Sequence, residues 1–202
     1  MKIIDSLNEW SQKWRAQNFA KLFKFLTEKN VTANKITFFR ALGAPLMIIL
    51  FPRNPQAAVI VALIVGLSDF FDGGLARYQN TSSDRGKFWD VLVDNGNYVF
   101  GVYALISSGF FSNQILSFHL VISPIMFLLA TIKESENRTT DWIIHSYYTD
   151  IYFKPVAIVS VVLFAFFSTN FVNETFFLLN IAMTITAMYY VWVLHKRWQK
   201  AV

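Results

Sequence analysis

Long apolar segments alternate with short polar gaps along most of the chain. The hydropathy pattern predicts six membrane-spanning helices, at about residues 36–51, 57–76, 88–108, 115–132, 153–168 and 176–194. Each segment approaches the length of about 20 residues that a helix needs to cross the hydrocarbon core. A soluble helical bundle is the alternative, but its helices would carry a polar stripe, which these segments mostly lack. We therefore expect an all-α, polytopic membrane protein with six transmembrane helices.

The residues before the first span follow a different pattern. Ile3, Leu7, Trp10 and Trp14 recur at helical spacing, with basic residues largely on the other sides. This pattern predicts an amphipathic helix that lies in the membrane interface; packing on a partner helix is the alternative. No internal repeat or linker divides the chain. Residues 1–202 are therefore expected to form a single membrane domain, with a juxtamembrane amphipathic helix at 1–33 and a six-helix core at 34–202.

Composition and charge agree with this topology. Of the 202 residues, 54% are hydrophobic and 15% charged, and the absence of cysteine excludes a disulfide framework, a thiol nucleophile and a cysteine-based zinc site. If the N-terminus is cytoplasmic, nearly all Lys and Arg fall on the inner side; Arg53 lies outside and Arg40 lies within the first span. This bias follows the positive-inside rule and places both termini in the cytoplasm. The net charge of +5 also fits attraction to an anionic leaflet, so a nucleic-acid partner is not expected.

Acidic and small residues interrupt the apolar pattern in the second and third spans. Within each span their spacing places them on one helix face: Asp69, Asp72, Gly73 and Ala76 on the second, and Gly86, Asp90 and Asp94 on the third. A short turn joins the two helices, so the marked faces of these antiparallel neighbours can meet. The sequence therefore predicts a pocket lined by four carboxylates and three very small residues, toward the cytoplasmic side.

Four carboxylates in such surroundings require positive charge. A charged side chain near the bilayer centre costs about 2.5 to 3.5 kcal/mol on insertion scales. Lys and Arg are too few among the spans to neutralise four acids, so we expect bound metal or protonation. With no Cys and no nearby His, the oxygen ligands favour Mg²⁺, Mn²⁺ or Ca²⁺ over zinc, and four carboxylates suit a two-metal site that holds phosphate oxygens. Arg77 could contact the same phosphates, or could simply anchor the helix end at the interface.

The identities and spacings of these acidic and small residues, together with Arg77, resemble the signature of the CDP-alcohol phosphatidyltransferases, D-x2-D-G-x2-A-R-x8-G-x3-D-x3-D. The residues that match it are Asp69, Asp72, Gly73, Ala76, Arg77, Gly86, Asp90 and Asp94. Upstream, Asn34, Thr37 and Arg40 resemble the family's N-x2-T-x2-R at the entrance to the first span. The alternative for this segment is a helix start capped by Asn34.

This resemblance implies a reaction and a set of roles. A CDP-linked lipid, usually CDP-diacylglycerol, would give its phosphatidyl group to the hydroxyl of a small, possibly phosphorylated, alcohol and release CMP, as a step of phospholipid biosynthesis. The resemblance also implies Mg²⁺ or Mn²⁺ as cofactor and a homodimer. The implied metal ligands are Asp69, Asp72, Asp90 and Asp94, with Asp94 also the general base; the implied CDP-lipid contacts are Gly73, Ala76, Arg77 and Gly86, with Asn34 and Thr37.

The acceptor alcohol stays open. Asn95 follows Asp94, where relatives that use glycerophosphate commonly have Lys. Lys133, Arg138 and Lys154, all on the predicted cytoplasmic side, could bind a phosphorylated acceptor such as glycerol 3-phosphate or an inositol phosphate, or could only obey the positive-inside rule. Two further functions remain as alternatives: transfer of a CDP-linked head group to diacylglycerol, and transport of divalent cations.

Overall fold

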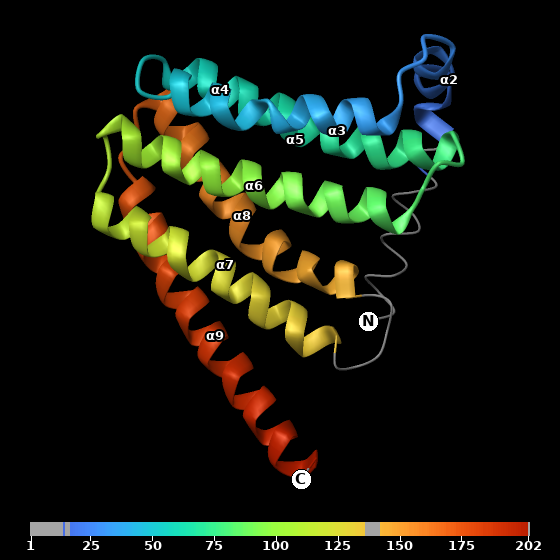
Figure 1. Ribbon diagram of the computed structural model, residues 1–202. Coiled ribbons are helices and arrows are strands. Elements are labelled where there is room, and N and C mark those ends of the chain that lie inside the picture. The colour runs from blue at the N-terminus through green and yellow to red at the C-terminus, as the bar shows by residue number, and fades with distance from the viewer. Residues whose placement is uncertain (1–13, 15–16, 136–141, 202) are drawn as a thin grey trace. The chain divides into compact units, whose positions relative to one another are not determined.

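The computed structural model describes residues 14, 17–135 and 142–201, and every regular element in these ranges is a helix (Figure 1). This confirms the predicted all-α class. Residues 1–13 of the predicted amphipathic helix lie outside the described ranges. The helices are α2 (Ala20–Glu28), α3 (Ala33–Ala41), α4 (Gly43–Leu50), α5 (Pro55–Tyr78), α6 (Asp84–Ser108), α7 (Asn113–Ser135), α8 (Trp142–Phe167) and α9 (Val172–Ala201).

Several of these helices are apolar enough to cross a membrane. In the described ranges, length and composition identify three candidate spans, Ala33–Leu50, Pro55–Tyr78 and Val172–Gln199, and two shorter apolar helices, Asn113–Leu129 and Lys154–Phe167. The helix α6 contains the predicted third span but belongs to neither group; its first half carries several charged residues, which lower its hydropathy. The count of six spans therefore stays a prediction.

The first predicted span is divided into two helices, α3 and α4, at Leu42. At the start of α3, the hydroxyl of Thr32 accepts a hydrogen bond from the backbone N–H of Lys35 at 3.4 Å. The cap is therefore Thr32, and the alternative in which Asn34 caps this helix is wrong. At the junction, a Cβ on Gly43 would lie 2.4 Å from Cγ2 of Val65, so a glycine here allows the chain to pass close to α5.

A short turn joins α5 to α6, as the sequence predicts. Asn80 adopts a left-handed conformation (φ 53°), and the backbone N–H of Thr81 donates to the carbonyl of Ala76 at 2.9 Å, which ends α5. The hydroxyl of Ser83 then accepts from the N–H of Gly86 at 3.1 Å and caps α6. Both halves of the signature therefore lie on consecutive helices.

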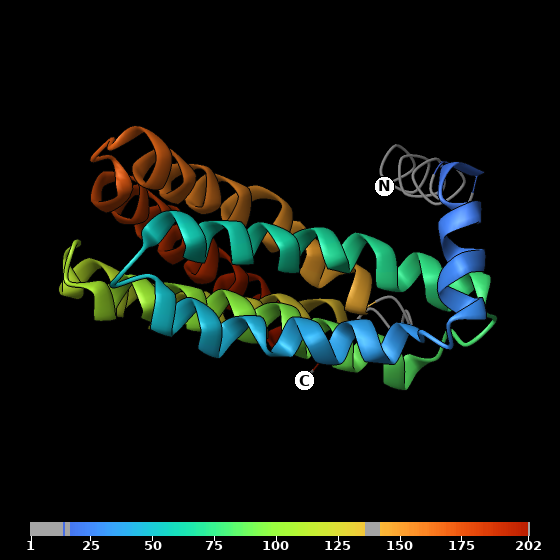
Figure 2. The ribbon, with the colours of Figure 1, turned by 90° about the horizontal axis from the view of Figure 1, so that it is seen from above.

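The chain forms two compact units, and the first consists of Met1–Ala44 and Val61–Asn97. In this unit α2 runs across the signature end of α5 (Figure 2). Its buried Phe23 packs on Gly74, where an added Cβ would lie 2.7 Å from the ring. The side-chain amide of Gln79 donates to the carbonyl of Val31 at 2.8 Å and to the hydroxyl of Thr27 at 3.1 Å. These contacts fix α2 to the C-terminal end of α5.

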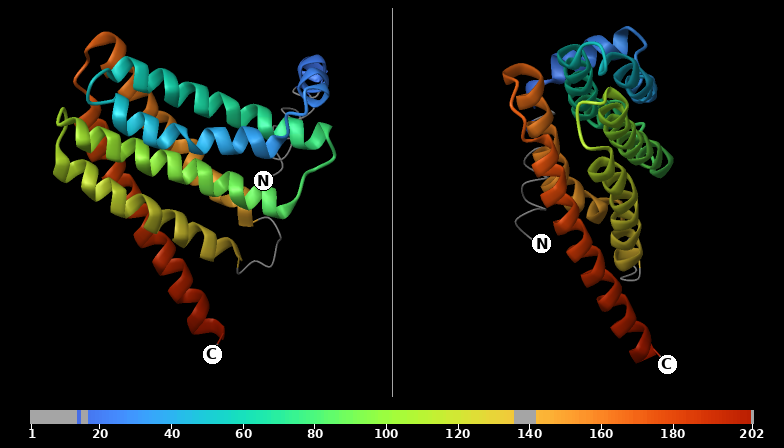
Figure 3. Two further views of the ribbon diagram at one scale, coloured as in Figure 1. Left: turned by 45° about the horizontal axis from the view of Figure 1, so that its top comes forward. Right: turned by 90° about the vertical axis from the view of Figure 1, so that its left-hand side faces the viewer.

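The second unit consists of Pro45–Ile60 and Tyr98–Val202. Its helices α7, α8 and α9 pack against one another, with α9 crossing α7 (Figure 3). Buried side chains of Ile122, Met126, Met183 and Ala187 form the apolar core between α7 and α9.

The same unit contains a hydrogen-bonded network of polar side chains centred on His119, which is fully buried. The side-chain amide N–H of Asn180 donates to the carbonyl of Ile115 at 2.9 Å, so its oxygen faces Nδ1 of His119 at 2.7 Å. Nδ1 therefore donates, and Nε2 accepts from the hydroxyl of Tyr98 at 2.8 Å. The imidazole links α6, α7 and α9 in one fixed tautomer, which is a structural role.

We predict that His119→Ala lowers the free energy of unfolding by about 2 kcal/mol or more, because it leaves Tyr98 and Asn180 without their buried partner and opens a cavity. The matched control is His195→Ala, because His195 is exposed and contacts only Gln199 one turn away at 3.0 Å among the bonds described. Its effect should stay within about 0.5 kcal/mol. Unfolding of the detergent-solubilised variants, followed by tryptophan fluorescence, measures both. Equal stability of the two variants would contradict the structural role.

Candidate active site

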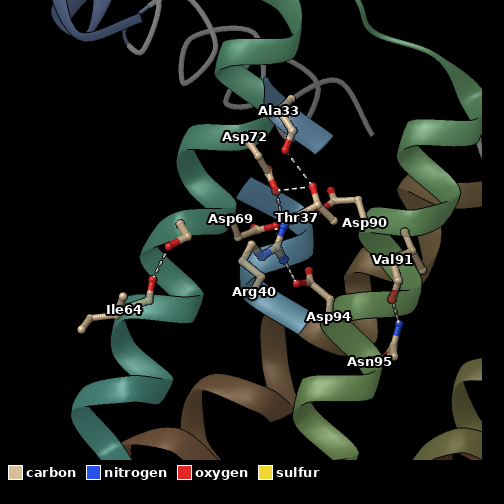
Figure 4. A network of polar contacts seen from close by, with 11 residues as sticks. Ala33, Thr37, Arg40, Ile64, Asp69, Asp72, Asp90, Val91, Asp94 and Asn95 are labelled. Carbon is tan, nitrogen blue, oxygen red and sulfur yellow. Dashed lines mark hydrogen bonds and ion pairs between the residues drawn. The ribbon is translucent and has the colours of Figure 1, made fainter. Parts of the chain in front are cut away.

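Four carboxylates from two helices converge on one guanidinium from a third (Figure 4). Arg40 extends from α3, Asp69 and Asp72 from α5, and Asp90 and Asp94 from α6. Nη2 of Arg40 lies 2.7 Å from Asp69 and also pairs with Asp94, while Nη1 lies 2.5 Å from both Asp72 and Asp90. The predicted meeting of the two acidic helix faces is therefore confirmed. We call these four aspartates and Arg40 the acidic cluster.

The acidic cluster is closed at one end and open at the other. The side chains of Arg40 and Asp72 are 1% and 4% exposed. Those of Asp69, Asp90 and Asp94 are 32%, 28% and 34% exposed. A ligand can therefore reach three of the carboxylates from outside, while Arg40 and Asp72 are buried.

Thr37 supports the buried end of the cluster. Its hydroxyl lies 3.0 Å from Oδ2 of Asp72 and 3.3 Å from the carbonyl of Ala33, one turn earlier on α3. The hydroxyl has one hydrogen, so it donates to one of these oxygens at a time. Thr37 thus lies at the site, where it contacts Asp72; its contact with a CDP-lipid stays a prediction.

Arg40 is the residue of the cluster that the sequence argument missed. The expectation that only metal or protons would meet the acids was incomplete, because a single guanidinium reaches all four carboxylates. The signal was present in the sequence: Arg40 is the basic residue inside the first predicted span, and charged groups in such positions pair with one another. The predicted shortage of positive charge is still present, because one guanidinium against four ionised carboxylates leaves an excess of three negative charges.

The arrangement fits a divalent cation. Oxygens of Asp69, Asp72 and Asp90 all lie within 4.8 Å of one another. At that separation two carboxylates repel by about 3 kcal/mol in a medium with an effective dielectric constant of about 20, so a hard cation bound between them is strongly favoured. Asp94 lies outside this group of three and shares Arg40 with it. Its assignment as both metal ligand and base, and the second metal ion, stay predictions.

The small residues of the signature differ in the space around them. A Cβ on Gly73 would meet only the tip of Arg77, with its Nη1 at 3.7 Å and its Nη2 at 4.0 Å. A Cβ on Gly86 would lie 3.3 Å from the hydroxyl oxygen of Ser83. The space beside Gly74, the next residue, is occupied by the ring of Phe23. The room beside Gly73 therefore fits the expectation that a bulky ligand approaches α5 there.

The remaining residues predicted to contact the substrates, as far as the structure describes them, lie on α3, α5, α7 and α8. On α5, Ala76 is half-buried and Arg77 exposed, and Asn34 is exposed in the first turn of α3.

Of the three predicted acceptor contacts, Arg138 lies outside the described residues and Lys133 is described only as part of α7. Lys154 belongs to the second unit, where its ammonium lies 5.2 Å from the centre of the Tyr98 ring. The predicted roles of these residues stay predictions.

Comparison with known proteins identifies the family. The sequence profile of the CDP-alcohol phosphatidyltransferases matches residues 30–195, which contain the whole acidic cluster. The chain belongs to the CDP-alcohol phosphatidyltransferase family. This confirms the resemblance derived from the signature and classes the chain with the transferases.

A curated relative narrows the comparison. The chain is 32% identical over 97 residues to a CDP-diacylglycerol–glycerol-3-phosphate 3-phosphatidyltransferase of Aquifex aeolicus (strain VF5). That match covers 48% of this chain and 49% of the relative, so the chain spans about half the length of the curated relative it matches. No solved structure matches the chain significantly.

Proposed function

We propose that the protein transfers the phosphatidyl group of CDP-diacylglycerol, or a similar CDP-lipid, to the hydroxyl of a small alcohol and releases CMP. The observation that supports this function best is the convergence of the four signature aspartates into one half-open cluster. Membership of the family supplies the reaction class.

The four carboxylates of the cluster would have two different roles in the reaction. Asp69, Asp72 and Asp90 would hold one or two Mg²⁺ or Mn²⁺ ions, which when bound neutralise the diphosphate and stabilise the CMP leaving group. Asp94 would accept the proton of the acceptor hydroxyl. The hydroxyl oxygen then bonds to the phosphorus that carries diacylglycerol, and the bond from this phosphorus to the bridging oxygen of CMP breaks.

Residues around the cluster would bind the CDP-lipid. The space beside Gly73 would admit the nucleotide, with Ala76, Gly86, Asn34 and Thr37 as further contacts. Arg77 would offer its guanidinium to the phosphates. The acyl chains would remain in lipid, and the cluster would open to the cytoplasm together with both termini, as the distribution of basic residues predicts. A homodimer stays a prediction from the family.

Glycerol 3-phosphate is the acceptor that we propose to test first. The name of the Aquifex relative includes this acceptor. Asn95 weakens this choice, because relatives that use glycerophosphate commonly have Lys at this position. The side-chain amide of Asn95 donates to the carbonyl of Val91 at 2.9 Å. The other acceptors are therefore retained as arms of the same assay.

The deciding assay combines purified protein, labelled CDP-diacylglycerol, Mg²⁺ or Mn²⁺, and a panel of alcohols that includes glycerol 3-phosphate, inositol phosphate and serine. Lipid products identified by mass, with equimolar CMP, would establish the transfer and its acceptor. Product formed only from a CDP-linked head group and diacylglycerol would favour the alternative transferase. Divalent-ion uptake into proteoliposomes without CMP release would favour a transporter.

We predict that Asp72→Asn abolishes transfer while the protein stays folded, because it removes a charged ligand from the predicted cation site. Removal of divalent ions with EDTA should do the same, and Mg²⁺ or Mn²⁺ should restore wild-type activity. Turnover and bound Mn²⁺, the latter measured by electron paramagnetic resonance, check both statements. Full activity in metal-free buffer would exclude the metal-dependent mechanism.

Asp94→Asn should reduce turnover by about 10² to 10⁴ while CDP-lipid affinity changes little, because the amide keeps the size of the side chain but cannot accept the proton. Turnover assays and equilibrium binding of a CDP-lipid separate the two effects. A parallel loss of affinity and turnover would instead make Asp94 a metal ligand and leave the base unassigned.

Gly73→Leu should weaken CDP-lipid binding at least tenfold, because the leucine fills the space where the nucleotide is proposed to lie. Gly66→Leu is the matched control, since a Cβ at Gly66 on the same helix meets nothing within 4 Å. It should leave the affinity unchanged. Equal affinities for Gly73→Leu and wild type would show that the nucleotide lies elsewhere.

A further inference from the structure

Arg40 occupies the centre of the acidic cluster, where it faces every carboxylate of the signature at once. Its two terminal nitrogens each contact two aspartates, and its side chain is 1% exposed. An arginine buried to this degree is normally held by several kinds of acceptor, including backbone carbonyls.

Here the contacts described for the guanidinium are to aspartates alone. Nε of Arg40 is buried without a hydrogen-bond partner among the described residues. The guanidinium is therefore held in place by the charge of the cluster, and its own hydrogen-bonding capacity is not fully used.

The same carboxylates form the predicted cation site. Oxygens of Asp69, Asp72 and Asp90 lie within 4.8 Å of one another, and Arg40 contacts all three residues. An oxygen that donates its lone pairs to a small divalent ion at about 2.0 to 2.6 Å has less capacity for a guanidinium, and the two cations repel each other.

We infer that Arg40 is the built-in counter-cation of the metal-free site, and that it gives up its carboxylates when a divalent ion binds. Guanidinium and metal ion would thus compete for one set of oxygens. This inference rests on the proposed function, because it requires that the acidic cluster binds a divalent ion.

Two consequences distinguish this role from that of a permanent structural ion pair. Without metal, loss of Arg40 leaves four carboxylates unneutralised, so the protein should be strongly destabilised. With metal bound, most of this loss should disappear, because the ion takes over the neutralisation. By linkage, the antagonism must also appear as tighter metal binding when Arg40 is absent.

The test compares wild type with Arg40→Met, which keeps an unbranched side chain and removes the charge. Arg53→Met is the matched control: Arg53 is exposed, contacts the carbonyl of Ile49 at 3.3 Å, and belongs to the other unit. Each full-length protein is purified in detergent, treated with EDTA, and titrated with MnCl₂. Tryptophan fluorescence follows thermal unfolding, and electron paramagnetic resonance measures free Mn²⁺.

We expect Arg40→Met to unfold at least 5 °C below wild type in EDTA, to recover most of that difference at saturating Mn²⁺, and to bind Mn²⁺ at least tenfold more tightly than wild type. Arg53→Met should match wild type in all three measurements. Arg40→Lys should lie between, because an ammonium keeps the charge but lacks the planar fork that reaches four acids.

Other outcomes overturn the inference. An equal loss of stability with and without Mn²⁺ would show that Arg40 keeps its contacts in the metal-bound protein. Weaker Mn²⁺ binding by Arg40→Met would show that Arg40 helps to build the site. If wild type and Arg40→Met both fail to bind Mn²⁺, the proposed metal site fails and the inference with it, whereas equal Mn²⁺ affinities would reject only the role of Arg40.

Discussion

The excess of negative charge around Arg40 is the constraint on which the first compact unit depends. Four carboxylates are gathered from two helices, with one guanidinium from a third helix among them. Carboxylates repel one another, and the guanidinium between them offsets part of that repulsion. The short capped turn at Asn80 joins α5 directly to α6. The close approach of the chain at Gly43 brings α3 near α5, so that Arg40 reaches the carboxylates. The local structure is thus arranged to satisfy an electrostatic requirement.

Much of the site was predictable because helical spacing fixes which residues share a face. Asp69 and Asp72 on one helix, and Asp90 and Asp94 on the next, converge as their spacings indicate. The role of Arg40 was not predictable in the same way. Its distance in the chain from the acids, 32 residues from Asp72 and 54 from Asp94, carries no periodic signal that would assign it to them. Only packing in three dimensions shows that one arginine serves four partners.

The fold shows a similar division. Long apolar segments predict helices reliably because a helix pairs its backbone polar groups within the segment itself, as lipid requires. The break of the first span at Leu42 escaped prediction because it lies beside Gly43, where the chain passes close to Val65 of α5. The cap at Thr32 is a local contact with Lys35, and it escaped prediction because Asn34, two residues on, is also a common capping residue. His119 is a further example. Its place inside an apolar helix gives no hint that Tyr98 and Asn180 satisfy both ring nitrogens from helices far away in the chain.

Gly73 and Gly74 are adjacent on α5 but face different surroundings. The side at Gly74 accepts Phe23 of α2, while the side at Gly73 stays clear except for the tip of Arg77. Two adjacent residues point about 100° apart on a helix, so neither use interferes with the other. Because α5 is one continuous helix, the residue on which Phe23 of α2 packs and the acidic face belong to the same element. Helix α2 is thereby packed onto the helix that carries Asp69 and Asp72, at residues that face away from the space beside Gly73.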